Sequence, residues 1–481
     1  MAESRIQFTL AAAVLIIAFA FITFYRLGVR PLQDFDEAIY AQVAHEAMQS
    51  GNQLGFTWQG NPPMHRPEKW FEKPPLMIWL TEISEALFGV NEFAARFWTA
   101  IFAILTLPLT FLFARELSRE IGAGKGDGPR AGGDVAAFVA VAAFFGAYQF
   151  MDDARILQMD IPVGFFVVLS LYAFWRAREN ARFYFLFWFA LAFGLMIKSV
   201  IGLLPLPVIF LFSLLARDFR YLKIKNFWLG LLLFFALILP WHIIESLRYG
   251  GEFWHQYLFY HLLERYSSAL EGNSGPLTFY LAIAFQEQFF FWALAVALVY
   301  FIARSFRSKA HLFVTVAIVF VFLFFSTAGT KLPPYILVIY PYAAMAIGIA
   351  FVDFSGWLEK FQKNAALPVV TIVMVIFVVA GFQNARANLA GENNSQLVSD
   401  KAVGEYLKDH CLDEPVYYYS VIRIKPSIIF YSDRRVGYYA DFQKSPPPGR
   451  FSLIAQGPPH DFPNATVLFS AESEKVYQVG P

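Results

Sequence analysis

The sequence has almost no cysteine and little charge. Cys411 is the single cysteine among 481 residues, which excludes an internal disulfide framework and a thiolate metal site. Only 16% of the residues are charged, and Lys and Arg number 38 against 37 Asp and Glu. No basic arm or aromatic-interleaved basic patch is present, so nothing in the sequence indicates a nucleic-acid partner.

What the chain does have is apolar residues. They make up 57% of the sequence, and Phe alone occurs 55 times. A soluble domain of this composition would precipitate, so the class is a membrane protein with many spans. The first apolar run, residues 6–25, is long enough to cross a bilayer. It lacks a small-residue cleavage site, so we expect an anchor and not a removable signal.

Apolar runs of spanning length recur about eleven times. Each predicts a helix, because a backbone exposed to lipid must satisfy its own polar groups. The expected spans are residues 7–25, 93–114, 135–150, 161–175, 183–197, 200–215, 227–244, 279–302, 312–327, 334–352 and 367–382. The predicted fold is therefore an all-α polytopic membrane domain over residues 1–383, followed by a small domain over 384–481.

The distribution of Lys and Arg predicts the orientation. Every second connection is basic, and basic connections face the cytoplasm. These connections lie near residues 115–130, 176–182, 217–225, 304–309 and 360–363. The N-terminus is then cytoplasmic, and the tail after residue 383 is outside. The other connections face outward, at 28–92, 151–160, 198–199, 245–278 and 329–333.

The outward segments are expected to fold locally. A surface helix begins with Asp36 as its N-cap and stops near Gly51. Residues 253–266 read as an amphipathic piece on the membrane surface. In the tail, 398–410 reads as a helix, and 416–420, 427–431, 451–455 and 466–469 read as strands, which predicts a small α/β domain.

Three outward segments carry carboxylates that could do chemistry. Asp36 and Glu37 begin the surface helix, and either could be a general base, a metal ligand or simply a cap. Glu72 and Lys73 precede two prolines that stiffen the chain, and a fixed Lys suits a phosphate unless it merely snorkels. Asp160 precedes an apolar span, as a cap or as a third carboxylate of the same site.

Further polar residues occupy the remaining outward loops. His261 could bind a metal ion and Arg265 a phosphate, with Glu264 between them. Lys198 and Lys331 lie at the outward ends of spans, where a snorkelling lysine is also common. Each of these residues alone has an ordinary structural explanation. Their coincidence on one face of the membrane indicates a shared site.

Several of these segments resemble motifs of a known family. Residues 36–41 (DEAIYA) and 71–76 (FEKPPL) resemble the signature pair of the family 39/83 glycosyltransferases. These enzymes include the protein O-mannosyltransferases and, more similar to this chain, the bacterial lipid A aminoarabinose transferases. Further matching blocks follow in the family's order at 194–205, 261–276 and 330–337.

The resemblance implies the GT-C fold and an inverting transfer of sugar on the outer face of the bacterial inner membrane. The donor would be a polyprenyl-phosphate sugar, and the acceptor a glycolipid such as lipid A, or a protein. Asp36 would activate the acceptor, Asp160 would be a second acid, and Glu72 would orient the acceptor or hold an ion. The other expected roles are substrate binding by Glu37, Tyr40, Lys73, Lys198, Arg265 and Lys331, and divalent-metal binding by Asp36, Glu72 and His261. No nucleotide cofactor is implied, membrane lipid surrounds the chain, and the oligomeric state is left open.

Two other classes remain to be compared. A transporter would usually carry ionisable residues at mid-span and repeated halves, whereas here the charges lie at one face and no repeat is evident. A non-catalytic scaffold of the same fold would be favoured by loss of Asp36 or Asp160, and both are present.

Overall fold

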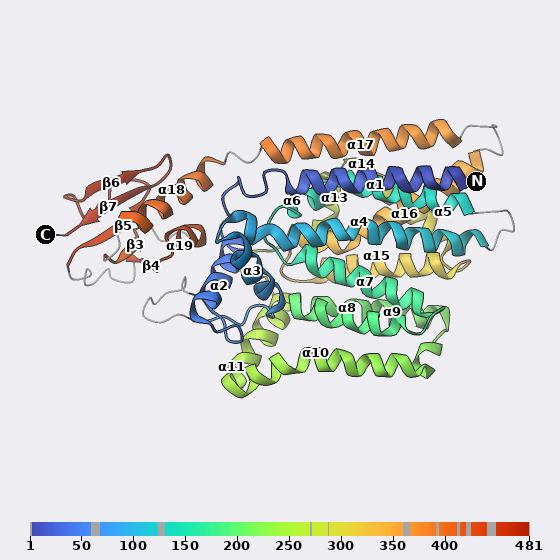
Figure 1. Ribbon diagram of the computed structural model, residues 1–481, viewed down its shortest axis with the longest axis horizontal. Coiled ribbons are helices and arrows are strands. Elements are labelled where there is room, and N and C mark those ends of the chain that lie inside the picture. Colours follow the sequence, from blue (N-terminus) through green and yellow to red (C-terminus); the bar gives the residue numbers. More distant parts are fainter. Residues whose placement is uncertain are drawn as a thin grey trace.

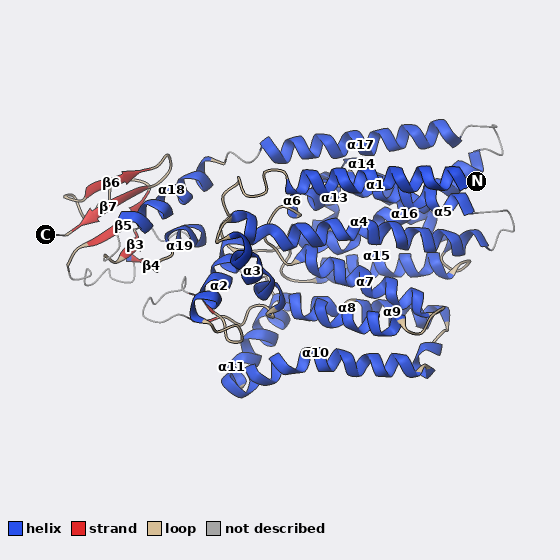
Figure 2. Cartoon of the chain, viewed as in Figure 1, coloured by secondary structure: helices blue, strands red, loops and turns tan. Residues whose placement is uncertain are grey.

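The computed structural model describes residues 2–58, 68–123, 130–269, 272–286, 288–358, 366–390, 394–410, 414–419, 425–439 and 449–480. The chain forms a long bundle of helices with a small sheet domain beyond one of its ends (Figures 1 and 2).

Within those residues, eight helices are long and apolar enough to cross a membrane. They lie in α1 (Ala2–Phe24), α4 (Glu92–Ala123), α7 (Asp160–Ala177), α8 (Phe183–Lys198), α10 (Lys225–Tyr249), α15 (Lys309–Thr327), α16 (Tyr340–Leu358) and α17 (Ala366–Ala390). Three shorter apolar helices are α5 (Arg130–Phe145), α9 (Pro205–Ala216) and α14 (Gln288–Arg304). Each expected span overlaps one of these helices, so the polytopic helical architecture is confirmed.

The two ends of the bundle differ. The N-terminus lies at one end, and the sheet domain lies beyond the other, as an odd number of crossings requires (Figure 1). Helices α2 (Asp36–Ser50), α3 (Leu76–Phe88) and α11 (Gly251–Trp254) lie at the end nearer the sheet domain. The loops expected to face outward therefore gather at one end. Which end faces the cytoplasm stays a prediction.

The surface helix at residue 36 is present, but its cap differs from the expectation. Phe35 is the N-cap of α2, and Asp36 is its first helical residue, without a side-chain cap bond. Likewise Met159, and not Asp160, caps α7. The cap interpretation of both acids was wrong, because each carboxylate lies one residue inside its helix and faces other charged groups. The stop at Gly51 is confirmed by its left-handed φ of 67°.

Shorter elements connect the helices. They are β1 (Thr57–Trp58), β2 (Glu68–Lys69), α6 (Tyr148–Asp153), η1 (Ser199–Leu203), η2 (Arg220–Lys223), the π-helical η3 (His255–Glu264), α12 (Arg265–Ser267), α13 (Phe279–Gln286) and η4 (Pro333–Ile339). Helix α11, η3 and α12 together make up the amphipathic piece expected over 253–266.

The C-terminal domain is a small α/β unit, as expected. Its sheet has the order β4-β3-β5-β7-β6, parallel from β4 to β5 and antiparallel from β5 to β6. Its elements are α18 (Ser395–His410), β3 (Val416–Tyr418), α19 (Pro426–Ser432), β4 (Val436–Tyr438), β5 (Phe451–Ala455), β6 (Thr466–Ser470) and β7 (Lys475–Val479). The strand expected at 427–431 is wrong. A short, fully buried apolar run has no periodicity to separate strand from helix, and the proline at its start favours a helix N-terminus.

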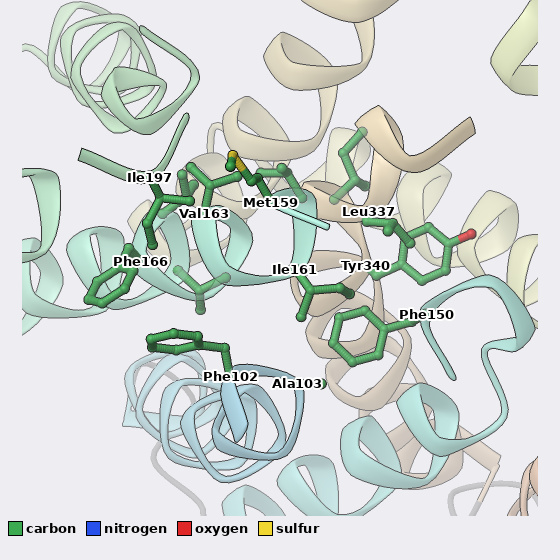
Figure 3. Close-up of a cluster of buried hydrophobic side chains, with 14 of the residues drawn as sticks. Phe102, Ala103, Phe150, Met159, Ile161, Val163, Phe166, Ile197, Leu337 and Tyr340 are labelled. Atoms are coloured by element: carbon green, nitrogen blue, oxygen red, sulfur yellow. The ribbon is translucent and has the colours of Figure 1, made fainter. Parts of the chain in front are cut away.

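The end of the bundle nearer the sheet domain contains a buried apolar cluster (Figure 3). Ile161 of α7 and Ile197 of α8 point into it and are 1% and 0% exposed. Each is the chain neighbour of a charged residue, Asp160 and Lys198 respectively. Close packing is the main force between membrane helices, so this cluster fixes the helix ends that present the two charges.

Candidate active site

Asp36 lies among four other charged groups. The carboxylates and ammonium groups that act on it most strongly belong to Glu72, Lys73, Lys198 and Asp160, which come from three other segments. Asp36 keeps solvent-accessible surface, and it lies beside the cavity described below without being one of its lining residues. Surrounding protein atoms, and then the negative charge of Glu72, raise the pKa of the Asp36 carboxyl above its ordinary value.

Each lysine beside Asp36 is paired with another acid. Lys198 Nζ lies 2.6 Å from both carboxylate oxygens of Asp160, and Lys73 pairs with Glu72. All four side chains are at most 20% exposed. Lys198 also lies 4.7 Å from the ring centroid of Tyr335. Charges this well shielded interact strongly and are expensive to leave unpaired.

An open cavity of about 710 Å³, a volume that includes space open to solvent, lies beside these pairs. Its wall combines charged side chains with apolar ones. The lining residues are Glu72, Lys73, Asp160, Lys198, Ser199, Val200, Ile201, Tyr257, Arg265, Tyr266, Phe324, Phe325, Ala328, Thr330 and Tyr335. A cavity lined by both cations and branched or aromatic side chains offers contacts to an anionic headgroup and to an apolar tail.

Close backbone contacts bring Lys198 to this cavity. A Cβ atom at Gly202 would lie 2.0 Å from the carbonyl carbon of Gly194, so only glycine lets η1 fold back against α8. The reversal occurs at Ser199, which has a φ of 48°. The conformation turns Lys198, Val200 and Ile201 toward one cavity. The close contact between α8 and η1 therefore explains why the 194–205 block contains glycines.

A second close contact positions Arg265. The backbone N–H groups of Gly329 and Thr330 donate to the carbonyls of Tyr266 and Arg265 over 2.7 and 3.1 Å. A Cβ at Gly329 would lie only 2.6 Å from the backbone of Ser268. The segments around residues 265–268 and 329–330 are thus held edge to edge, and Arg265 Nη1 donates to the Tyr335 hydroxyl at 3.4 Å.

Two expected substrate-binding residues are engaged elsewhere. Glu37 is 1% exposed and forms a paired salt bridge with Arg96, so it supports the site and does not face the cavity. Lys331 is 6% exposed, donates to the Ala328 carbonyl, and is absent from the cavity wall. Tyr40 is buried beside Asp36 and Glu72, where burial and then the Asp36 charge raise the pKa of its hydroxyl.

The expected metal ligands are only partly assembled. Asp36 and Glu72 are neighbours, whereas the side chain of His261 lies outside the described residues. Among the residues that are described, no group of three His, Cys, Asp or Glu side chains is arranged to hold a metal ion.

Sequence reasoning missed several residues of the cavity wall. Tyr335 lies inside the block at 330–337, but the resemblance implies a binding role only for Lys331 in that block. A single sequence does not predict that Ser199 and Tyr257 line the cavity, because their positions depend on how η1 and η3 fold.

Comparison with known proteins identifies relatives. The family description "Dolichyl-phosphate-mannose-protein mannosyltransferase" matches residues 13–256, which is more than half of the chain. An uncharacterised protein of Aquifex aeolicus is 30% identical over 361 residues, covering 74% of this chain and 66% of that protein. An undecaprenyl phosphate-α-4-amino-4-deoxy-L-arabinose arabinosyl transferase of Proteus mirabilis is 25% identical over 384 residues, covering 76% of this chain and 66% of that enzyme. The chain thus spans slightly less than two thirds of these curated relatives.

The fold has solved counterparts. The crystal structure of ArnT from Cupriavidus metallidurans bound to undecaprenyl phosphate matches with a TM-score of 0.77 at 18% identity, covering 98% of this chain and 99% of that one. The archaeal oligosaccharyltransferase AglB from Archaeoglobus fulgidus matches with a TM-score of 0.58 at 13% identity, covering 88% and 64% of the two chains. These matches place the chain in the same GT-C fold.

Proposed function

The chain belongs to the dolichyl-phosphate-mannose-protein mannosyltransferase family, and we propose that it is a glycosyltransferase of the bacterial inner membrane. It would move a sugar from a polyprenyl-phosphate carrier to an acceptor on the outer face. The single observation that carries this proposal is the cavity in which cations, acids and an apolar wall meet at the outward end of the bundle.

The donor phosphate fits the cationic side of the cavity. Lys73, Lys198 and Arg265 all line it, and they come from three different segments. Two of them are already paired with acids, so the net positive charge available to a phosphate is moderate. That suits a carrier that must leave after the reaction. Cations at the phosphate oxygens stabilise the charge that develops as the sugar departs.

The prenyl chain would occupy the apolar wall. Val200 and Ile201 of η1 and Phe324 and Phe325 of α15 line the cavity beside the charged groups. In this arrangement the phosphate lies at the boundary between polar and apolar surroundings, as a membrane-bound carrier requires.

Asp36 is the proposed base. Its carboxylate would accept the proton of the acceptor's nucleophile while that nucleophile attacks the anomeric carbon opposite the phosphate, which inverts the configuration. A raised pKa makes an aspartate a better proton acceptor than an ordinary one. Asp160 has a different task, since both of its oxygens hold Lys198.

A divalent ion, where the reaction uses one, would be held by Asp36 and Glu72. Their mutual repulsion, one of the causes of the raised Asp36 pKa, is what a cation would relieve. Mg²⁺ is commonly held by one or two carboxylates together with substrate phosphate and water, so two acids suffice. The ion would supply charge neutralisation at the phosphate.

For the acceptor we propose a glycolipid of the lipid A class. The arabinosyl transferase of Proteus mirabilis named above takes its name from an undecaprenyl-phosphate sugar, and its match covers 76% of this chain. A protein acceptor is the second candidate, because the matching family is named for protein mannosyltransferases. A transporter is disfavoured, since the site's charges gather at one end of the bundle and none of its lining residues marks a path across it.

Mass spectrometry of surface glycolipids tests this proposal. A strain lacking the gene should lose a defined sugar mass from its lipid A or another glycolipid, and the wild-type gene should restore it. A gene encoding Asp36→Asn should not. An unchanged glycolipid profile with an altered glycoprotein profile would move the proposal to a protein acceptor, and no change in either would overturn it.

A further inference from the structure

The turn that carries Asp36 has a strained backbone. Phe35, between Asp34 and Asp36, has a φ of 66° and a ψ of −127°. L-residues rarely adopt this conformation, and a bulky side chain makes it costly. Such a conformation persists only where the surroundings hold the chain on both sides.

On the membrane side, Glu37 holds the turn. Its Oε2 accepts a hydrogen bond from the Gln33 backbone N–H over 2.8 Å. Glu37 is itself fixed by Arg96, which is 1% exposed. Gln33 and Glu37, two positions before and two positions after Phe35, are thereby tied to α4.

On the outer side, the C-terminal domain holds the same turn. Ser427 donates to Asp34 Oδ1 from its hydroxyl over 2.6 Å and from its backbone N–H over 3.2 Å. The hydroxyl of Tyr431 accepts from the Leu32 N–H over 2.7 Å and donates to Glu92 Oε1 over 2.9 Å. Ser427 is fully buried, and Tyr431 is 8% exposed.

Both of these groups come from α19, nearly four hundred residues away in the sequence. Helix α19 packs beside α2, between it and the sheet (Figure 1). None of the described residues of the C-terminal domain lines the cavity described above. Its contacts with the turn therefore bear on the catalytic acid and not on the donor.

We propose that α19 of the C-terminal domain positions the catalytic turn, with Ser427 and Tyr431 as positioning residues that act on Asp36 through Asp34 and Leu32. This inference rests on the proposed function, because it takes Asp36 as the base. It assigns the outer domain a part in turnover beyond covering the membrane domain. A small displacement of a reacting group lowers the rate steeply, since catalysis depends on attack geometry.

Kinetics of purified full-length protein test the proposal. Ser427→Ala should lower kcat with a polyprenyl-phosphate sugar donor by roughly tenfold or more, with the KM for donor within twofold of wild type. Asp433→Asn is the matched control. Asp433 also joins α19 to α2, through His45 at 3.3 Å and Gln49 at 3.3 Å, but it does so at the far end of α2. Equal losses in both variants would mean that the domain only needs to dock, and would overturn the proposal.

A pair of variants at Asp34 separates the effect of its hydrogen bond to Ser427 from the effect of its negative charge. Asp34→Asn keeps a side-chain oxygen that accepts from Ser427, so kcat should stay within about threefold of wild type, whereas Asp34→Ala should lower kcat as Ser427→Ala does. If Asn is as damaging as Ala, Asp34 acts through its charge and the positioning role fails. This pair also covers the case in which Ser427→Ala does not fold.

Hydrogen exchange gives a readout that does not depend on activity. Exchange of the backbone amides of residues 32–37 should accelerate at least tenfold in Ser427→Ala and remain near wild type in Asp433→Asn. Unchanged exchange in Ser427→Ala would overturn the proposal. If wild-type protein transfers no sugar while the exchange result holds, the proposed function fails and the positioning of the turn stands.

Discussion

Arg96 on α4 and Glu37 on α2 form a fully paired salt bridge in the interior. Arg96 Nε lies 2.7 Å from Glu37 Oε1, Arg96 Nη2 lies 3.0 Å from Oε2, and both residues are 1% exposed. The same Oε1 accepts the N–H of Leu157 over 2.9 Å. Glu37 is the chain neighbour of Asp36, and Leu157 lies in the loop three residues before Asp160. One buried pair thus sets the spacing of the two acids of the site.

Breaking this pair should destabilise the protein strongly. Arg96→Ala leaves a buried carboxylate without its partner, and Glu37→Gln leaves a buried guanidinium without its counter-charge, each at a cost of about 3–5 kcal/mol. We expect a large fall in the melting temperature of both variants in detergent. Arg220→Ala, which removes an exposed arginine paired with Asp218, should leave the melting temperature close to that of wild type. Equal melting temperatures for Arg96→Ala and Arg220→Ala would contradict this role.

Binding of the donor phosphate should depend on Lys73 and Arg265. Alanine at either position should remove about 2–4 kcal/mol of transition-state stabilisation, seen in kcat/KM at several donor concentrations. Lys69→Ala is the matched control, because Lys69 lies in the same segment but pairs with Glu252 at the surface, with 44% and 49% exposure. Its loss should cost below about 1 kcal/mol. Near-normal kinetics for both cavity variants would remove the cationic phosphate site from the account.

Stability should fall as the pH rises, because α3 buries Glu82 and Glu85, and no basic partner for them is found among the described residues. Burial, and then the neighbouring Glu82, raises the pKa of Glu85 to about 8, and neither of its oxygens has a hydrogen-bond partner among the described residues. Between its ordinary pKa of 4.5 and about 8, the folded state keeps a proton that the unfolded state loses. Stability contributed by that proton is therefore lost across this window as the pH rises.

Glu85→Gln should abolish part of this dependence. The variant should melt near wild type at pH 5 and above it at pH 9. Glu405→Gln, at a position whose side chain is 58% exposed, should follow the wild-type curve at both. A Glu85→Gln variant that melts below wild type at pH 9 would show that the carboxylate is needed in its charged form.

The sequence was most informative where one physical effect dominates. Hydropathy alone places the spans, because lipid requires long apolar helices. The quoted motifs predict one shared site for Asp36, Glu72, Lys73, Lys198 and Arg265, and the position of Asp160 before an apolar span adds it to that site. The structure brings these six together as one charged cluster beside the cavity.

Long-range partners could not be predicted from one sequence. Glu37 reads as a second site acid until its contact with Arg96 is seen, 59 positions along the chain. The bond between Asp34 and Ser427 spans 393 positions. The buried run at 427–431 has no periodicity, so its helix depends on packing against α2. In each case a tertiary contact determines the role or the structure of the segment, and the local sequence pattern does not predict that contact.

The central claim is that Asp36 is the base of a sugar transfer, and turnover of purified Asp36→Asn tests it most directly. With a short-chain polyprenyl-phosphate sugar and a glycolipid acceptor, the variant should lose at least about 100-fold in kcat while its melting temperature matches wild type. Wild-type kcat should rise with pH as the Asp36 carboxyl, whose pKa is raised, loses its proton. Near-native turnover of Asp36→Asn would place the base elsewhere and contradict the account.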